Sequence, residues 1–221
     1  MRIWQLLMVL GLFHIRKASA KRVCVQKKFD ILIVEDVSNS IGKLQYSSVK
    51  RFEQQMLGDL EINSRGINIA FMVFSVNARV VFQLNAYSNN RSAVLAAVNA
   101  QVHEGGASTH IGEAIKLAND DVFTGRNGDR PDADNMVIFF TDAYGTDDDK
   151  LVVAANIGYL QAKSEVFVVH SKGPGETANR NATISALASD PDNSHAFSVY
   201  NSNAFNAFMQ KVRAMHCESL Y

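Results

Sequence analysis

Short apolar runs rich in Ile, Val and Phe alternate along this chain with longer segments whose apolar residues recur at helical spacing. The apolar runs predict strands at residues 29–35, 67–76, 79–84, 136–141, 166–170 and 196–200. The amphipathic segments predict helices at residues 43–62, 90–102, 109–123, 148–163, 183–188 and 203–215. Strands that alternate with helices favour an α/β fold in which helices cover both faces of a mostly parallel sheet.

The segment at residues 79–84 is the exception to this alternation. It follows the strand at 67–76 too closely for a helical crossover, so we expect it to pair antiparallel with that strand. The predicted fold is a doubly wound, mostly parallel six-stranded sheet with one antiparallel edge strand and helices on both faces. Because the chain shows no internal repeat and no linker, we expect a single domain at residues 21–221. Sheets of this kind bind ligands beyond the carboxyl ends of their strands.

Residues 1–20 have the pattern of a secretory signal peptide. Arg2 gives a basic start, residues 3–13 are largely apolar, and small residues at 18–20 form a cleavage site. The apolar stretch is too short for a membrane anchor, which needs about 20 residues. We therefore expect cleavage after Ala20 and a secreted, extracellular protein without membrane insertion.

The charge of the expected mature chain argues against nucleic acid as a partner. The full chain has 22 basic and 22 acidic residues, and its first twenty residues contain three basic residues and no acid. Their removal leaves a net charge of −3. A mildly acidic domain lacks the positive surface that a phosphate backbone or an anionic membrane requires.

Two further features suit an extracellular protein. The only cysteines, Cys24 and Cys217, lie near the two ends of the expected mature chain. In an oxidising compartment the simplest interpretation is one disulfide that joins the two ends, and the alternative is two buried thiols. Asn90 and Asn181 each begin an Asn-x-Ser/Thr sequence, so both are candidate glycosylation sites.

Three loops at the predicted strand ends carry side chains with hard oxygen atoms. The candidates are Asp36, Ser38 and Ser40 in the first loop, Ser108 and Thr109 after the Gly-Gly turn of the second, and Asp142 in the third. Carboxylates and hydroxyls without thiols suit Mg²⁺, Mn²⁺ or Ca²⁺ rather than Zn²⁺. Two carboxylates do not saturate such an ion, which should keep water or take an acidic oxygen from a partner. The alternative is ordinary capping of helices and loops by Ser, Thr and Asp.

These loops resemble the metal loops of one known family. Residues 30–42, 105–115 and 139–143, together with residues 187–197, resemble a von Willebrand factor type A domain with a metal-ion-dependent adhesion site (MIDAS). The resemblance implies that the metal positions are Asp36, Ser38, Ser40, Thr109 and Asp142. It also places the two cysteines where many extracellular members close a disulfide.

The chain departs from the family pattern in ways that affect the loops. The second loop has one extra residue between Gly-Gly and Thr109, so Ser108 is an alternative ligand. Asn39, Ala143 and His170 stand where glycine is frequent or usual in the family. We expect these differences to change loop geometry and affinity more than the existence of the site.

Two other groups near these loops have alternative interpretations. The acidic run Asp147–Asp149 suits the positive start of a helix, and the alternative is an acidic rim or a second cation site. His103 and His110 flank the second loop. They are either surface or capping residues, or they make binding sensitive to mild acid.

The resemblance implies a non-enzymatic adhesion domain that binds an extracellular protein, such as collagen or another matrix protein, through a Mg²⁺-type ion. An acidic side chain of the partner would complete the coordination. The alternative is a matrix-assembly module that binds collagen-like partners or itself without metal. An enzyme is disfavoured because the chain has no Gly-x-Ser-x-Gly elbow, no phosphate-binding Gly-Lys loop and no recognisable Ser/His/Asp arrangement.

Overall fold

The computed structural model describes residues 24–145, 147–171, 178–201 and 203–219, so the expected signal peptide lies outside it. Six strands form one sheet in the order β4-β3-β2-β5-β6-β7. Their bounds are β2 Phe29–Asp36, β3 Ile67–Phe74, β4 Ala78–Phe82, β5 Asp134–Thr141, β6 Glu165–His170 and β7 Ala196–Ser198. All neighbouring pairs are parallel except β3 and β4. This sheet confirms the predicted fold class.

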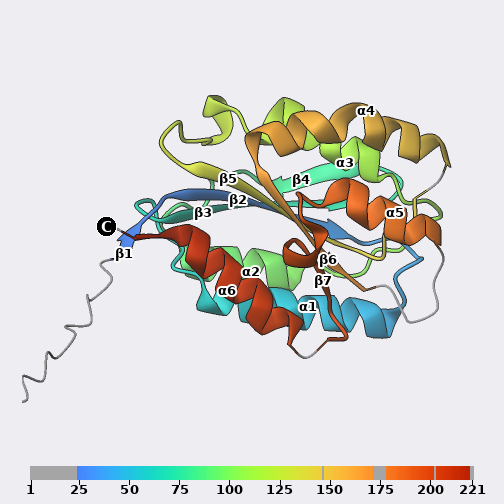
Figure 1. Cartoon of the computed structure of the whole chain (residues 1–221), viewed down its shortest axis with the longest axis horizontal. Coiled ribbons are helices and arrows are strands. Elements are labelled where there is room, and N and C mark those ends of the chain that lie inside the picture. Colours follow the sequence, from blue (N-terminus) through green and yellow to red (C-terminus); the bar gives the residue numbers. More distant parts are fainter. Residues whose placement is uncertain (1–23, 146, 172–177, 202, 220–221) are drawn as a thin grey trace, which may run out of the picture.

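Helices cover both faces of the sheet (Figure 1). One face is covered by α1 (Lys43–Asp59), α2 (Arg91–Ala100) and α6 (Ala204–His216). The other is covered by α3 (Ile111–Leu117), α4 (Asp147–Lys163) and α5 (Ala178–Leu187). None of the helices in the described part of the chain is long and apolar enough to cross a bilayer.

The central strand β2 shows why the apolar runs are nearly continuous. Ile31 and Ile33 pack into the core under α1, α2 and α6, whereas Leu32 and Val34 pack into the core under α3, α4 and α5. All of them are fully buried. A strand that is buried on both faces needs apolar residues at successive positions, and β2 has them from Ile31 to Val34.

Some elements differ from the sequence-based expectation. The segment 109–123 forms α3 only to Leu117 and continues as one turn of π-helix over Ala118–Val122. Helix α5 begins at Ala178 rather than at residue 183. Its first turns are polar and contribute little to the core, so they carry no apolar periodicity that would predict a helix.

Two short strands that the sequence did not predict bring the ends of the domain together. Strand β1 (Cys24–Gln26) pairs antiparallel with β8 (Cys217–Ser219), and Gln26 lies opposite Cys217. The two cysteines therefore lie on adjacent strands. Their side chains are outside the described part of the structure, so the disulfide stays a prediction.

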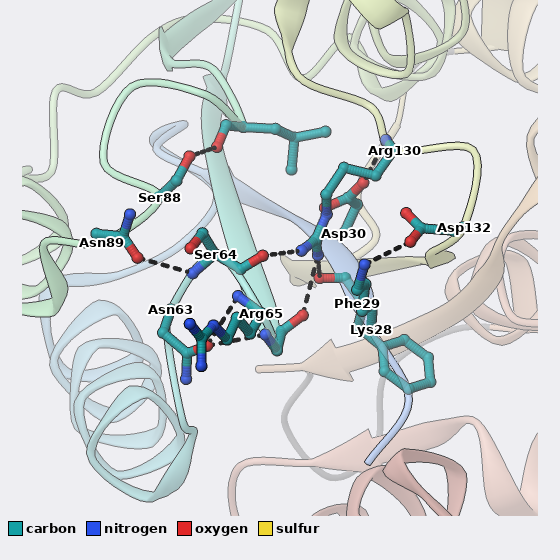
Figure 2. A network of polar contacts seen from close by, with 12 residues as sticks. Lys28, Phe29, Asp30, Asn63, Ser64, Arg65, Ser88, Asn89, Arg130 and Asp132 are labelled. Atoms are coloured by element: carbon teal, nitrogen blue, oxygen red, sulfur yellow. Dashed lines mark hydrogen bonds and ion pairs between the residues drawn. The ribbon is translucent and has the colours of Figure 1, made fainter. Parts of the chain in front are cut away.

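A buried ion pair fixes the amino end of β2 (Figure 2). The Arg130 guanidinium donates a hydrogen bond to Asp30 Oδ1 at 2.9 Å, and the Arg130 backbone N–H donates to Asp30 Oδ2 at 2.7 Å. The same guanidinium donates to the carbonyls of Phe29, Ser64 and Gly66. Asp30 is fully buried, so these contacts join β2, the turn before β3 and the loop before β5.

We expect Arg130→Ala to lower the free energy of unfolding by about 3–5 kcal/mol, because it leaves the Asp30 carboxylate buried without its cation. Arg126 is a matched control in the same loop. It pairs with Asp121 but its side chain is 70% exposed, so Arg126→Ala should cost less than about 1 kcal/mol. Urea denaturation measures both values, and equal losses for the two variants would contradict the assignment.

A second buried charge cluster lies between β2 and α1. Lys50 Nζ is 2.9 Å from Glu35 Oε2 and 2.7 Å from Glu53 Oε2, and both glutamate side chains are fully buried. One ammonium cannot neutralise two buried carboxylates. Burial, followed by the negative charge of Glu35, raises the pKa of Glu53 well above its ordinary value.

This raised pKa predicts a pH-dependent effect of Glu53→Gln. As the pH rises above the unfolded pKa of glutamate, the unfolded chain releases the Glu53 proton while the folded chain retains it, so wild-type stability falls. Glutamine has no such proton. The free energy of unfolding of Glu53→Gln should therefore gain about 1 kcal/mol or more on the wild type between about pH 5 and about pH 8. Urea denaturation tests this, with the exposed Glu113→Gln as control, and a pH-independent difference would refute it.

Candidate metal-binding site

The site starts from Asp36, the last residue of β2, whose carboxylate is fully buried and held at both oxygens. The Ser38 backbone N–H donates to Asp36 Oδ1 at 3.0 Å. On the adjacent strand β5, Thr141 Oγ1 donates to Asp36 Oδ2 at 2.7 Å. The parallel pairing of β2 with β5 thus places the first and third predicted loops side by side.

Hydroxyl groups from two loops lie beside this carboxylate. Ser38 Oγ is 2.9 Å from Ser40 Oγ, and Thr109 Oγ1 donates to Ser38 Oγ at 3.0 Å. Ser40 Oγ is also 3.4 Å from Thr109 Oγ1 and donates to Asp142 Oδ1 at 3.3 Å. The structure therefore brings together the five side chains that the family resemblance singled out. Their role as metal ligands stays a prediction.

The second loop does not follow a strand, contrary to our expectation. It runs from the end of α2 to the start of α3 and is joined to the first loop by backbone hydrogen bonds. Gly105 N–H donates to the Val37 carbonyl at 2.9 Å, and Asn39 N–H donates to the Gly106 carbonyl at 3.2 Å. Gly106 has φ +151° and a Cβ there would lie 2.9 Å from Ser75 Oγ, so a side chain would push this loop away.

The structure distinguishes Thr109 from Ser108. Thr109 is buried within the hydroxyl cluster, whereas Ser108 Oγ lies 2.8 Å from His110 Nε2. The other ring nitrogen of His110 lies 2.7 Å from the Val76 carbonyl, and His103 Nε2 lies 2.8 Å from the Ser38 carbonyl. Both histidines therefore hydrogen-bond to the loops around the cluster.

Two positions at which the family often has glycine, 143 and 39, differ in their surroundings. Ala143 has φ +58°, in the left-handed region that favours glycine, and it is buried immediately after Asp142. Asn39 is exposed at the tip of the first loop. The left-handed backbone at position 143 explains why the family prefers glycine there, and this chain adopts it with alanine.

Asp149 belongs to α4 but caps the neighbouring helix α3. Its carboxylate accepts the backbone N–H of Ile111 at 3.0 Å and that of Gly112 at 2.7 Å, so it caps the start of α3, two residues after Thr109. Burial raises the pKa of Asp149, and these two backbone bonds oppose that rise. The acidic run lies at the start of a helix, α4, as predicted, and Asp149 in addition caps α3. The side chains of Asp147 and Asp148 lie outside the described part of the structure.

Burial and mutual repulsion destabilise the ionised carboxylates of the cluster. Burial, followed by the negative charge of Asp142, raises the pKa of Asp36 to about 7. Burial also raises the pKa of Asp142, although the Arg180 guanidinium opposes that rise. Among the described residues, none donates a hydrogen bond to the buried Asp142 Oδ2. Two close carboxylates, three hydroxyls and an oxygen without a donor fit a hard divalent cation.

Sequence reasoning missed three residues around the cluster. Thr141 orients Asp36, and its position directly before Asp142 could have indicated this. Arg180 Nη1 lies 3.7 Å from Asp142 Oδ2, and its guanidinium carbon lies 4.7 Å from the centre of the Tyr144 ring. Nothing in the sequence indicated Arg180, because it precedes the predicted start of its helix.

The two candidate glycosylation sites lie on the surface. Asn90 is exposed at the start of α2, where its side chain accepts the Ala93 backbone N–H at 3.0 Å. Asn181 is exposed within α5. Surface exposure is compatible with a glycan at either position, and their modification stays a prediction.

Comparison with known proteins gives consistent matches. The family model of the von Willebrand factor type A domain matches residues 30–211. Matrilin-3 of Gallus gallus is 29% identical over 91% of this chain and 43% of its own length. Integrin alpha-2 of Bos taurus is 28% identical over 85% of this chain and 16% of its own length. The collagen alpha-1(XII) chain of Notophthalmus viridescens is 27% identical over 86% of this chain and 20% of its own length. The chain spans less than half the length of each relative.

Solved structures share the fold at lower identity. Proximal thread matrix protein 1 from the mussel byssus aligns with a TM-score of 0.67 at 22% identity, covering 86% of this chain and 47% of that chain. Another structure of that protein, with zinc occupying its MIDAS motif, aligns with a TM-score of 0.66 at 19% identity, covering 87% of this chain and 48% of that chain.

The geometry predicts that Thr109→Ala weakens Mn²⁺ binding by at least about tenfold, because it removes an oxygen donor and the hydrogen bond that orients Ser38. Ser108→Ala is the matched control. Its hydroxyl faces His110, so we expect an affinity within about twofold of the wild type. Isothermal titration calorimetry measures both affinities, and circular dichroism checks the fold. Loss of affinity in Ser108→Ala alone would show that Ser108 is the ligand.

Proposed function

Because the chain belongs to the von Willebrand factor type A domain family, we propose that it is a secreted, non-enzymatic adhesion domain that recognises an extracellular protein through a divalent metal ion. The observation that carries this proposal is the cluster at the carboxyl edge of the sheet, in which Asp36, Asp142, Ser38 and Thr109 are buried and the hydroxyl of the exposed Ser40 joins them. A cation there would relieve the repulsion between the two carboxylates. An acidic side chain of the partner would complete its coordination.

The ion we propose is Mg²⁺, with Mn²⁺ and Ca²⁺ as alternatives. The residues that would hold it are Asp36, Ser38, Ser40, Thr109 and Asp142. The zinc in the MIDAS motif of the mussel protein supports a divalent cation at the equivalent place. Hydroxyl and carboxylate ligands without imidazole or thiolate favour the harder Mg²⁺ over zinc here. When bound, the ion would supply a positive centre for an acidic oxygen of the partner.

The surface around the cluster supports a protein as the partner. Leu44 at the start of α1 is 84% exposed, and Tyr144 directly after the third loop is 55% exposed. Val102 in the second loop and Tyr200 after β7 are also exposed. Exposed tyrosines and aliphatic side chains beside a polar centre are typical of protein interfaces. The matrix and integrin relatives suggest collagen or another matrix protein as the ligand, and an extracellular location.

The second candidate function is matrix assembly without metal. Leu151 and Tyr159 on the outer side of α4 are 74% and 73% exposed. This apolar surface favours contacts with collagen-like partners or with another copy. The two functions differ in their dependence on metal.

The adhesion proposal predicts that binding to immobilised collagen and to a matrix extract occurs in Mg²⁺ and is lost in EDTA. Asp142→Ala should abolish the same binding without unfolding the domain, because it removes one of the two carboxylates that would hold the ion. Asp59→Ala, which removes a half-exposed acid at the end of α1, should bind like the wild type. Surface plasmon resonance gives the affinities. Binding that survives both EDTA and Asp142→Ala would refute metal-dependent adhesion and favour the assembly module.

A further inference from the structure

Arg180 places a permanent positive charge beside the metal site. Arg180 lies in the first turn of α5. This helix lies at the end of the molecule toward which the arrow of β2 points (Figure 1). Arg180 Nη1 is 3.7 Å from Asp142 Oδ2, and the side chains of Arg180 and Asp142 are only 15% and 3% exposed. A guanidinium keeps its charge at any physiological pH.

The position of this guanidinium is constrained by an aromatic ring. Its carbon lies 4.7 Å from the centre of the Tyr144 ring, a distance at which a cation is attracted to the ring face. Tyr144 is two residues after Asp142, and its backbone N–H donates to Asp142 Oδ1 at 3.1 Å. The loop that presents Asp142 therefore also holds the arginine next to it.

The two oxygens of Asp142 have different partners. Oδ1 accepts hydrogen bonds from Tyr144 N–H and from Ser40 Oγ. Oδ2 accepts none from the described residues, and Arg180 is its ion-pair partner. A divalent cation held by Asp142 and the Arg180 guanidinium would draw on the same carboxylate and repel each other at short range.

We propose that Arg180 is a built-in competitor of the metal ion at Asp142 and weakens the affinity of the site for divalent cations. This inference rests on the proposed function. Arg180 also adds a positive charge beside the ion, and an acidic group of the partner would be attracted to both.

The test is calorimetric titration of Mn²⁺ alone into the wild type and into Arg180→Gln and Arg180→Met, both of which remove the charge. The methionine variant keeps an unbranched stem against Tyr144 in case glutamine disturbs the fold. We expect both variants to bind Mn²⁺ about tenfold more tightly than the wild type. Arg180→Lys keeps the charge and should stay within about threefold of the wild type.

Arg126→Gln removes an exposed arginine from the loop before β5 and controls for the change in net charge. It should bind Mn²⁺ like the wild type. Unchanged or weaker binding by Arg180→Gln and Arg180→Met would overturn the competitor role, as would tighter binding by Arg180→Lys or Arg126→Gln.

The same titrations separate this inference from the proposed function. If the wild type binds Mn²⁺, Thr109→Ala weakens that binding and the Arg180 variants bind like the wild type, the metal site is supported. Only the competitor role of Arg180 is then rejected. Absence of Mn²⁺ binding in the wild type and in all charge-removing variants would reject both. Binding that appears only in Arg180→Gln and Arg180→Met would support both.

Discussion

The burial of two carboxylates, Asp36 and Asp142, at one edge of the sheet is the constraint on which the surrounding loops depend. Buried charges must be paired or hydrogen-bonded. Asp36 receives a backbone N–H and the Thr141 hydroxyl, whereas Asp142 receives Ser40 and the backbone of Tyr144. These bonds satisfy acceptors but add no positive charge. The missing charge is supplied by Arg180 in this structure, and in the proposed function by a metal ion as well.

Much of the fold could be predicted because it follows from local patterns. Strands buried on both faces must be apolar at successive positions, so β2, β3 and β5 are visible in the sequence. The first turns of α5 were missed because they bury little. The pairing of β1 with β8 joins residues from opposite ends of the domain's sequence, and no local sequence pattern predicts such a contact.

The site was predictable in composition but not in its charge balance. The candidate ligands share one chemistry and lie in loops near the strand ends, so the five residues could be proposed together. The choice between Ser108 and Thr109 depends on which of the two hydroxyls hydrogen-bonds to His110, and the path of the loop decides this. Glu35 lies on β2 and its partner Lys50 lies on α1, so their ion pair depends on how that helix packs against the strand. Arg180 comes from a helix far along the chain. Ion pairs between distant elements are fixed only by the packed structure.

The charge balance has a consequence for how metal and partner would act together. If Arg180 weakens the binding of the metal ion, an acidic partner that approaches both positive groups offsets the repulsion between them. The partner would then strengthen metal binding, and by linkage the metal would strengthen partner binding by the same factor. Without Arg180 the ion would bind more tightly alone, and the partner would add only the coordination that its acidic side chain supplies. An arginine held by Tyr144 beside Asp142 therefore favours a domain in which metal binding and adhesion occur as one coupled event.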